Sequence, residues 1–179
     1  KPILMLVALT PSAMLFEDAG IDWSVIFMQD VFATPPFISG LALALVAFSQ
    51  FTVRFFADDF VEQYGPEKIT YCSVITLGIG VSLVGFAPNP VVALAGFSLV
   101  GAGTAVIFPL ATSAAAQRKD RPAAVNVAAL AQLSFVVFLV APPLLGAVAE
   151  FFGIRVSFGI GLPLVVLSWF MMRSLRPNA

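Results

Sequence analysis

The chain has 179 residues, of which 60% are hydrophobic and 11% charged, and its formal net charge is −1. A typical soluble domain carries roughly 45–50% apolar and about 25% charged residues. This composition therefore excludes an ordinary soluble fold, which would expose large apolar patches. The apolar composition makes a lipid bilayer the expected surrounding of the chain. The near-neutral charge gives no bulk attraction to nucleic acid, so no nucleic-acid partner is expected.

Long apolar runs separated by short clusters of charge, Pro and Gly predict an all-α, polytopic membrane protein. A membrane helix needs about 20 mostly apolar residues to span a hydrocarbon core of roughly 30 Å. The runs are too long and continuous for the alternating strands of a transmembrane barrel. We expect a single six-helix transmembrane bundle over residues 1–179, with crossings at 3–29, 37–57, 68–88, 91–115, 123–149 and 155–172.

The first expected crossing holds three carboxylates, Glu17, Asp18 and Asp22. One charge at the centre of a membrane helix costs about 2.5–3.5 kcal/mol, so these side chains must face protein, water or the interface. Helical spacing places Asp18, Asp22 and Gln29 on one stripe and Glu17 on another. A proton-coupled carrier needs carboxyl groups that gain and lose a proton. All four residues are therefore candidates for proton or solute contact, with Glu17 and Asp22 as the best.

A second interpretation of these acids stays open. The apolar run over residues 2–16 is short for a full span, so the first helix could end near Glu17 and leave the acids at the membrane interface. Against this, residues 21–28 are again mostly apolar, and only a continued helix uses them.

Small residues and prolines in the later crossings predict close packing and bending. Gly101 and Gly103 lie in the fourth crossing, followed by Pro109, and Pro142 and Pro143 lie in the fifth. Small residues let membrane helices approach closely, and a proline removes a backbone donor and favours a kink. The glycines fit either tight packing or bending during gating, and all five residues are candidate bending positions.

The basic residues are distributed unevenly between the two sides of the predicted bundle. With six crossings, eight of the nine Lys and Arg residues fall on one side and Arg155 alone falls on the other. The positive-inside rule then predicts that both termini are cytoplasmic. Because the chain begins with Lys1 and not Met, we expect a fragment or a processed chain.

No enzyme, cofactor or metal site is expected. The chain has no histidine, the commonest metal ligand and the usual catalytic base. The single cysteine, Cys72, lies in an apolar run and is expected to act as a small packing residue. A protease dyad made of Asp18 and Asp22 is disfavoured, because such dyads normally come from two separate segments.

The segment after the second expected crossing carries Arg54, then Asp58, then Gly65. In this order it resembles the loop signature of the major facilitator superfamily, in the variant of the sugar-permease-like bacterial members. The resemblance implies that the three residues belong to a cytoplasmic gating loop. The segment departs from the signature at Asp59 and Glu67, where basic residues are usual.

Three other stretches extend the resemblance to nearly the whole chain. Residues 96–109 are similar to the tenth helix of such carriers, and residues 141–155 to the eleventh helix and the turn into the twelfth. The acids of the first crossing resemble those in the seventh helix of a bacterial inner-membrane permease subgroup. The resemblance implies the C-terminal six-helix half of a twelve-helix secondary transporter, built from inverted three-helix repeats. The first and fourth crossings would then face a central cavity, and the transporter would move a small solute by alternating access.

Two functional hypotheses follow. In the first, the partners of the chain are the bilayer, a small solute, protons if transport is coupled to them, and a missing N-terminal six-helix half. In the second, the chain is a self-contained six-helix protein that works with a second copy of itself as a homo-oligomeric channel or small carrier. Six further crossings upstream in the gene would favour the first hypothesis.

Overall fold

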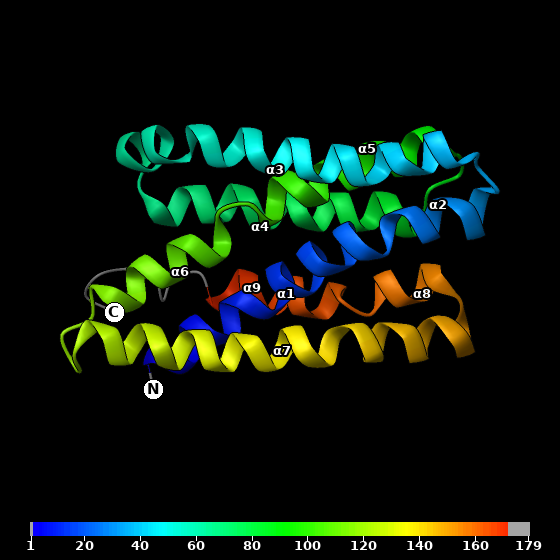
Figure 1. The fold of residues 1–179 in the computed structure, drawn as a ribbon. Helices are drawn as coiled ribbons and strands as arrows, with labels where there is room; N and C mark the ends of the chain where they lie inside the picture. Colours follow the sequence, from blue (N-terminus) through cyan, green and yellow to red (C-terminus); the bar gives the residue numbers. More distant parts are fainter. Residues whose placement is uncertain (1, 172–179) are drawn as a thin grey trace.

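A computed structural model of the chain describes residues 2–171, with side chains from residue 8 onward. Within that range the regular secondary structure is entirely helical, which confirms the predicted all-α class. The helices run side by side along one bundle (Figure 1). Their bounds are α1 Pro2–Asp22, α2 Ser24–Phe32, α3 Pro36–Tyr64, α4 Pro66–Gly85, α5 Pro90–Thr104, α6 Ile107–Ala116, α7 Ala123–Phe152, α8 Ile154–Gly159 and α9 Leu162–Met171.

Five helical stretches in the described part of the chain are long and apolar enough to cross a membrane. They coincide with the second to sixth expected crossings, and the chain is an integral membrane protein. Helices α1 and α2 cover the first expected crossing and are not among the five, so the count of six crossings stays a prediction. The five stretches are Pro36–Tyr64, Pro66–Gly85, Pro90–Ala116, Ala123–Phe152 and Ile154–Met171.

Two glycine turns have the same geometry at opposite ends of the bundle. Gly65 joins α3 to α4 with φ 84° and ψ 154°, and Gly153 joins α7 to α8 with φ 88° and ψ 154°. Each N–H donates 2.9 Å to the carbonyl four residues earlier, that of Val61 or Ala149. A positive φ favours glycine because it has no Cβ. The α3–α4 and α7–α8 junctions lie at opposite ends in Figure 1, as expected for inverted repeats.

The first and fourth expected crossings are interrupted in the same way. Trp23 separates α1 from α2 with φ −108° and ψ −10°, and Val106 precedes α6 with φ −115° and ψ −10°. In Figure 1 the chain bends visibly between α5 and α6. Each interruption lies in the first crossing of an expected three-helix unit, so the two units share a second local feature besides the glycine turn.

Hydroxyl groups tie α1 to the C-terminal helices. The Ser12 and Ser168 hydroxyls lie 2.7 Å apart, and the Thr10 and Ser134 hydroxyls 3.1 Å apart. Ser168 also donates to the Leu9 carbonyl at 2.9 Å. Hydrogen bonds of this kind help to hold membrane helices together, where packing and not water exclusion drives association. They fix the rotation of α1 and therefore the direction in which its carboxylates point.

Gly101 and Gly103, predicted as bending positions, lie at close contacts between helix backbones. A Cβ on Gly101 would collide with the Val46 carbonyl oxygen of α3, and one on Gly103 would lie 2.5 Å from the Leu77 nitrogen of α4. Real Cβ atoms essentially never come so close to backbone atoms. The two glycines therefore let α5 pack against α3 and α4 at once, and the interruption of the helix begins only beyond them, at Ala105.

We expect Gly101→Ala to destabilise the protein by about 1–3 kcal/mol, the usual cost of overpacking a well-packed interior. Thermal unfolding of the detergent-solubilised protein measures the change as a lower Tm. Gly40→Ala in α3 is the matched control, since a Cβ there meets nothing within 4 Å and alanine favours the helix. A Tm for Gly101→Ala equal to or above that of Gly40→Ala would contradict the packing role.

Candidate functional site

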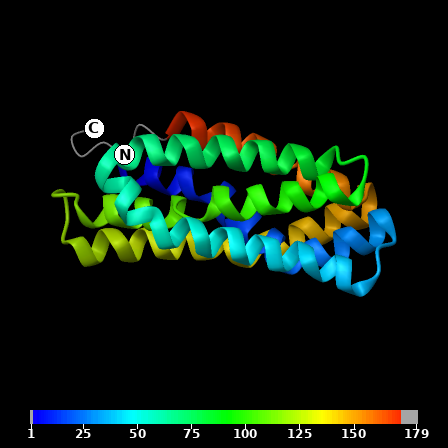
Figure 2. The ribbon, with the colours of Figure 1, turned by 90° about the horizontal axis from the view of Figure 1, so that it is seen from above.

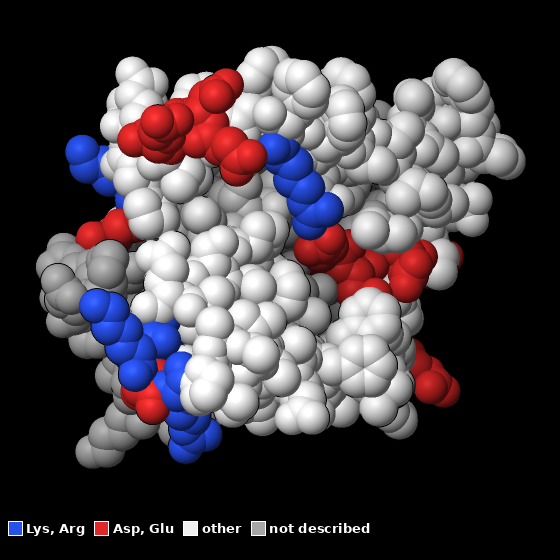
Figure 3. Space-filling model, turned by 60° about the vertical axis from the view of Figure 1, so that its left-hand side comes forward, with Lys and Arg blue, Asp and Glu red and all other residues white. Residues whose placement is uncertain are grey.

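A pocket of about 560 Å³ opens on one face of the bundle, between α1, α3, α6 and α7. Apart from one acid and one base, its wall is apolar. In Figure 3 a basic and an acidic side chain meet on a surface that is otherwise mostly uncharged. The lining residues are Met14, Glu17 and Ile21 from α1, Arg54 from α3, Phe108 and Pro109 from α6, and Phe138 from α7.

The acid and the base of the pocket form an ion pair. Arg54 Nη2 donates to Glu17 Oε1 at 3.0 Å, and the two side chains are 44% and 27% exposed. Glu17 lies midway along the α1–α2 stretch of residues 2–32. The pair therefore sits about halfway through the bundle, the depth at which solute and coupling-ion sites of secondary transporters lie.

The interruption between α5 and α6 holds the arginine in place. Pro109 has no N–H, so the carbonyl four residues earlier, that of Ala105, loses its helical donor. Arg54 Nε fills the gap and donates to the Ala105 carbonyl at 2.9 Å. Ala105 is fully buried, so an unpaired carbonyl there would be costly. The helix break thus anchors one edge of the guanidinium and leaves the other edge to Glu17.

The structure separates the four acidic and amide candidates of the first crossing. Only Glu17 lines the pocket. Asp18 is 7% exposed, and its Oδ2 has no hydrogen-bond partner among the described residues. Asp22, one turn further on, and Gln29, in α2, are exposed outside the pocket. The stripe predicted for Asp18, Asp22 and Gln29 therefore does not gather at one site with Glu17.

The predicted gating loop is helical over most of its length. Helix α3 continues to Tyr64, so Arg54 and Asp58 lie on successive turns of one helix, and only Gly65 lies in a turn. Asp58 is exposed and makes no ion pair within the described part of the chain. The resemblance assigned Arg54 to a cytoplasmic loop, whereas its side chain reaches Glu17 and Ala105 inside the bundle.

Two further candidates, Pro142 and Pro143, lie inside α7, which runs unbroken to Phe152. Pro142 cannot donate to the carbonyl of Phe138, whose side chain lines the pocket one turn earlier. Both helices that face α1 across the pocket, α6 and α7, therefore carry a proline close to its wall. The aromatic residues Phe108 and Phe138 were not among the candidates, because nothing in an apolar run distinguishes a pocket wall from a lipid contact.

Fold and pocket together define a polytopic helical membrane protein of inverted three-helix units with a charged pair facing an open hollow. The family model described as Major Facilitator Superfamily matches residues 7–179, nearly the whole chain. The chain belongs to the major facilitator superfamily, a family of transporters.

Curated relatives agree with this assignment. An uncharacterized MFS-type transporter of Yersinia pestis is 26% identical over 145 residues, which is 81% of this chain and 38% of the relative. An uncharacterized transporter of Sinorhizobium fredii is 32% identical over 160 residues, 88% of this chain and 42% of the relative. Membrane protein MosC of Rhizobium meliloti is 25% identical over 85% of this chain and 37% of the relative. The chain thus spans about two fifths of the length of these relatives, and the sugar-permease-like subgroup stays a prediction.

A double-mutant cycle tests the ion pair. We expect Glu17→Gln and Arg54→Gln to be non-additive in unfolding free energy by up to about 1 kcal/mol, the range for pairs that are partly exposed. The measurement is the Tm of the detergent-solubilised single and double variants. The control cycle joins Arg54→Gln with Asp30→Asn and should be additive, since Asp30 lies near the end of α2, outside the pocket, and makes no ion pair with Arg54. Equal coupling in both cycles would mean that the pair has no specific interaction.

Proposed function

We propose that this chain is the C-terminal half of a secondary active transporter that moves a small solute by alternating access, with proton coupling at Glu17. The observation that carries the proposal is the 3.0 Å ion pair between Glu17 and Arg54 on the wall of an open pocket, halfway through the bundle. Ionisable residues inside membrane segments are expensive and most often mark ion or solute pathways. Because the chain belongs to a transporter family, transport is the simplest function for this ion pair.

The pair suggests how a proton and a solute would compete for one arginine. While Glu17 is ionised, it accepts the hydrogen bond from Arg54 Nη2. When Glu17 takes up a proton, the attraction between opposite charges ends, and the Nη groups of Arg54 become free to donate to an acceptor on the solute. The Nε bond to the Ala105 carbonyl keeps the guanidinium in position meanwhile. A charge left unpaired in an apolar pocket is costly, so proton uptake favours solute binding.

The opposite wall of the cavity would come from an N-terminal six-helix half. The length of the relatives, of which this chain spans about two fifths, supports that arrangement over a second copy of a self-contained six-helix channel. The bias of eight basic residues to one supports a bacterial inner-membrane location with both termini cytoplasmic. Transport of this kind needs neither catalysis nor a cofactor.

Uptake by the full-length native protein in proteoliposomes tests the proposal. A panel of radiolabelled sugars, carboxylates and amino acids is offered with an imposed proton gradient. For the solute that the native protein accumulates, we expect Glu17→Gln to abolish accumulation, so that the internal concentration only reaches the external one. Exchange of labelled for unlabelled solute should persist, because a permanently neutral side chain imitates the protonated state.

Two variants serve as controls for that experiment. Asp30→Asn removes a carboxylate from the exposed surface of α2, outside the pocket, and should accumulate solute like the native protein. Asp22→Asn removes the other leading candidate, which is exposed outside the pocket, and should also retain coupling. Full accumulation by Glu17→Gln, or loss of coupling only in Asp22→Asn, would refute the role given to Glu17.

A further inference from the structure

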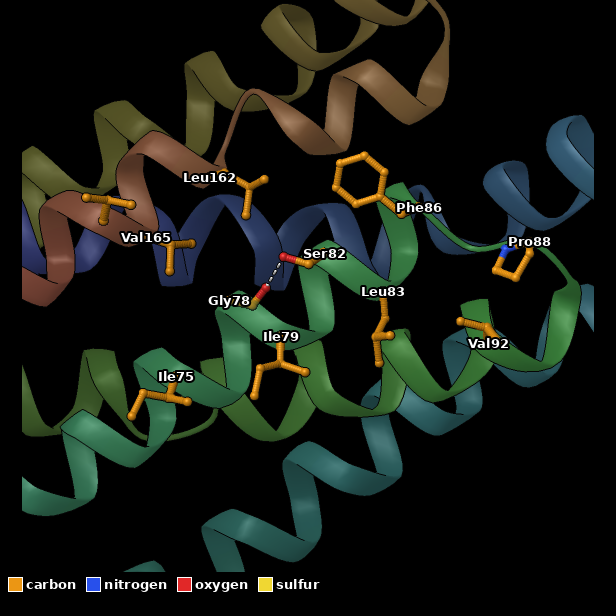
Figure 4. A pocket seen from close by; sticks show the side chains of 11 residues that line it. Ile75, Gly78, Ile79, Ser82, Leu83, Phe86, Pro88, Val92, Leu162 and Val165 are labelled. Atoms are coloured by element: carbon orange, nitrogen blue, oxygen red, sulfur yellow. Dashed lines mark hydrogen bonds between the residues drawn. The ribbon is translucent and has the colours of Figure 1, made fainter.

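A second hollow, which we call the outer groove, lies on the face of the bundle away from the charged pocket. It has a volume of about 860 Å³ and lies between α4, α9 and the start of α5 (Figure 4). Viewed from above, α4 and α9 form one edge of the bundle, and α3 and α7 form the other (Figure 2). The residues used below are Ile75, Ile79, Ser82, Phe86, Leu162 and Val165.

The groove offers hydrocarbon to its occupant. Ile75, Ile79 and Val165 are typical of its aliphatic wall. Its one hydroxyl, that of Ser82, already donates to the Gly78 carbonyl at 2.7 Å, as the dashed line in Figure 4 marks. The one hydroxyl on the groove wall thus already has a hydrogen-bond partner. An apolar chain can therefore occupy the groove without breaking a hydrogen bond.

The length of the groove matches one leaflet of a bilayer. Ile75 and Phe86, near its two ends, are eleven residues apart on α4 and its C-cap. At 1.5 Å per residue this is about 16 Å, roughly half of a hydrocarbon core of about 30 Å. The groove ends where α4 ends, at the side of the bundle that holds the α4–α5 connection. An acyl chain of that leaflet would fill it from the surface toward the midplane.

A cation stands at the surface end of the groove. A smaller hollow of about 430 Å³ shares Phe86 and Leu162 with the groove and is also lined by Arg155. Arg155 Nη1 donates to the Gly85 carbonyl at 3.1 Å, and the guanidinium lies 5.2 Å from the centre of the Phe32 ring. Arg155 is the one basic residue that the predicted topology assigns to this side of the membrane.

The guanidinium of Arg155 has donors to spare. It carries five N–H groups, and the bond to Gly85 is its one hydrogen bond to a described residue. No carboxylate of the described chain lies within 4 Å of it. Arginine donors in this state suit a phosphate, which they bind through charge-assisted and often paired hydrogen bonds.

We infer that the outer groove and Arg155 together bind one phospholipid of the leaflet opposite the termini. An acyl chain lies along α4 and α9, and the headgroup phosphate accepts hydrogen bonds from Arg155. A lipid with net negative charge binds more tightly than a zwitterionic one, because no carboxylate offsets the arginine. The site is separate from the charged pocket, so it does not depend on the proposed transport mechanism.

Native mass spectrometry of the full-length protein in detergent tests the inference, with phosphatidylglycerol and phosphatidylcholine titrated separately. We expect Arg155→Gln to weaken phosphatidylglycerol binding about tenfold, as for loss of a charge-assisted contact, and to weaken phosphatidylcholine binding less, because both lipids lose the phosphate contact but only phosphatidylglycerol loses a net attraction of opposite charges. Lys68→Gln, which removes one charge from the other end of α4, is the matched control and should bind like the native protein.

Ile79→Trp tests the acyl-chain part without touching Arg155. Ile79 is half exposed in the groove, so the larger side chain fills the space that a lipid chain would occupy, and both lipids should bind about tenfold more weakly. Native-like phosphatidylglycerol binding by either Arg155→Gln or Ile79→Trp would overturn the inference. Displacement of the lipid by millimolar inorganic phosphate alone would also overturn it, since the groove would then contribute nothing.

Discussion

One rearranged hydrogen bond links the helix interruption to the charged pocket. Pro109 denies the buried Ala105 carbonyl its helical donor, and the arginine of a different helix supplies one in its place. The replacement donor is a cation within an apolar bundle. A cation there requires a counter-charge, which Glu17 of α1 provides. Three separate segments, α1, α3 and the α5–α6 junction, are therefore held in one arrangement by one guanidinium. A break in a membrane helix is tolerated because a side chain repairs it.

Close backbone contacts lie on the α5 side of this junction. Gly101 and Gly103 bring α5 into backbone contact with α3 and α4, so the segment just before the break cannot rotate freely. Beyond it, α6 contacts α1 and α7, with Pro109 and Phe108 on the pocket wall. The junction therefore has tight backbone contacts on its α5 side and the charged pocket on its α6 side.

Hydropathy and glycine positions were enough to predict the class and most of the helices, because the membrane imposes length and composition on each crossing. They did not predict that α3 continues to Tyr64: the segment from Phe55 onward is too acidic for a span, yet nothing in it stops a helix before Gly65. The partnership of Glu17 and Arg54 was also missed. The two residues are 37 positions apart, and helical spacing tells which face a residue occupies but not which helix it meets. The sequence did carry one indication, because an acid within a membrane segment requires a compensating partner such as a base.

The two three-helix units share backbone features, but only one face of the bundle carries the charged pocket. Both three-helix units carry a glycine turn of the same shape and an interrupted first segment, whereas their last segments differ, since α4 is one helix and the final segment is divided into α8 and α9. The side chains at the two interruptions also differ. At the first, Trp23 keeps its helical bonds to Ala19 and Phe27 and leaves no carbonyl to be repaired. At the second, Pro109 leaves the Ala105 carbonyl without its helical donor, and Arg54 Nε donates to that carbonyl instead. The charged pocket therefore lies beside the interruption that contains Pro109, whereas the outer groove between α4 and α9 is lined almost entirely by apolar side chains.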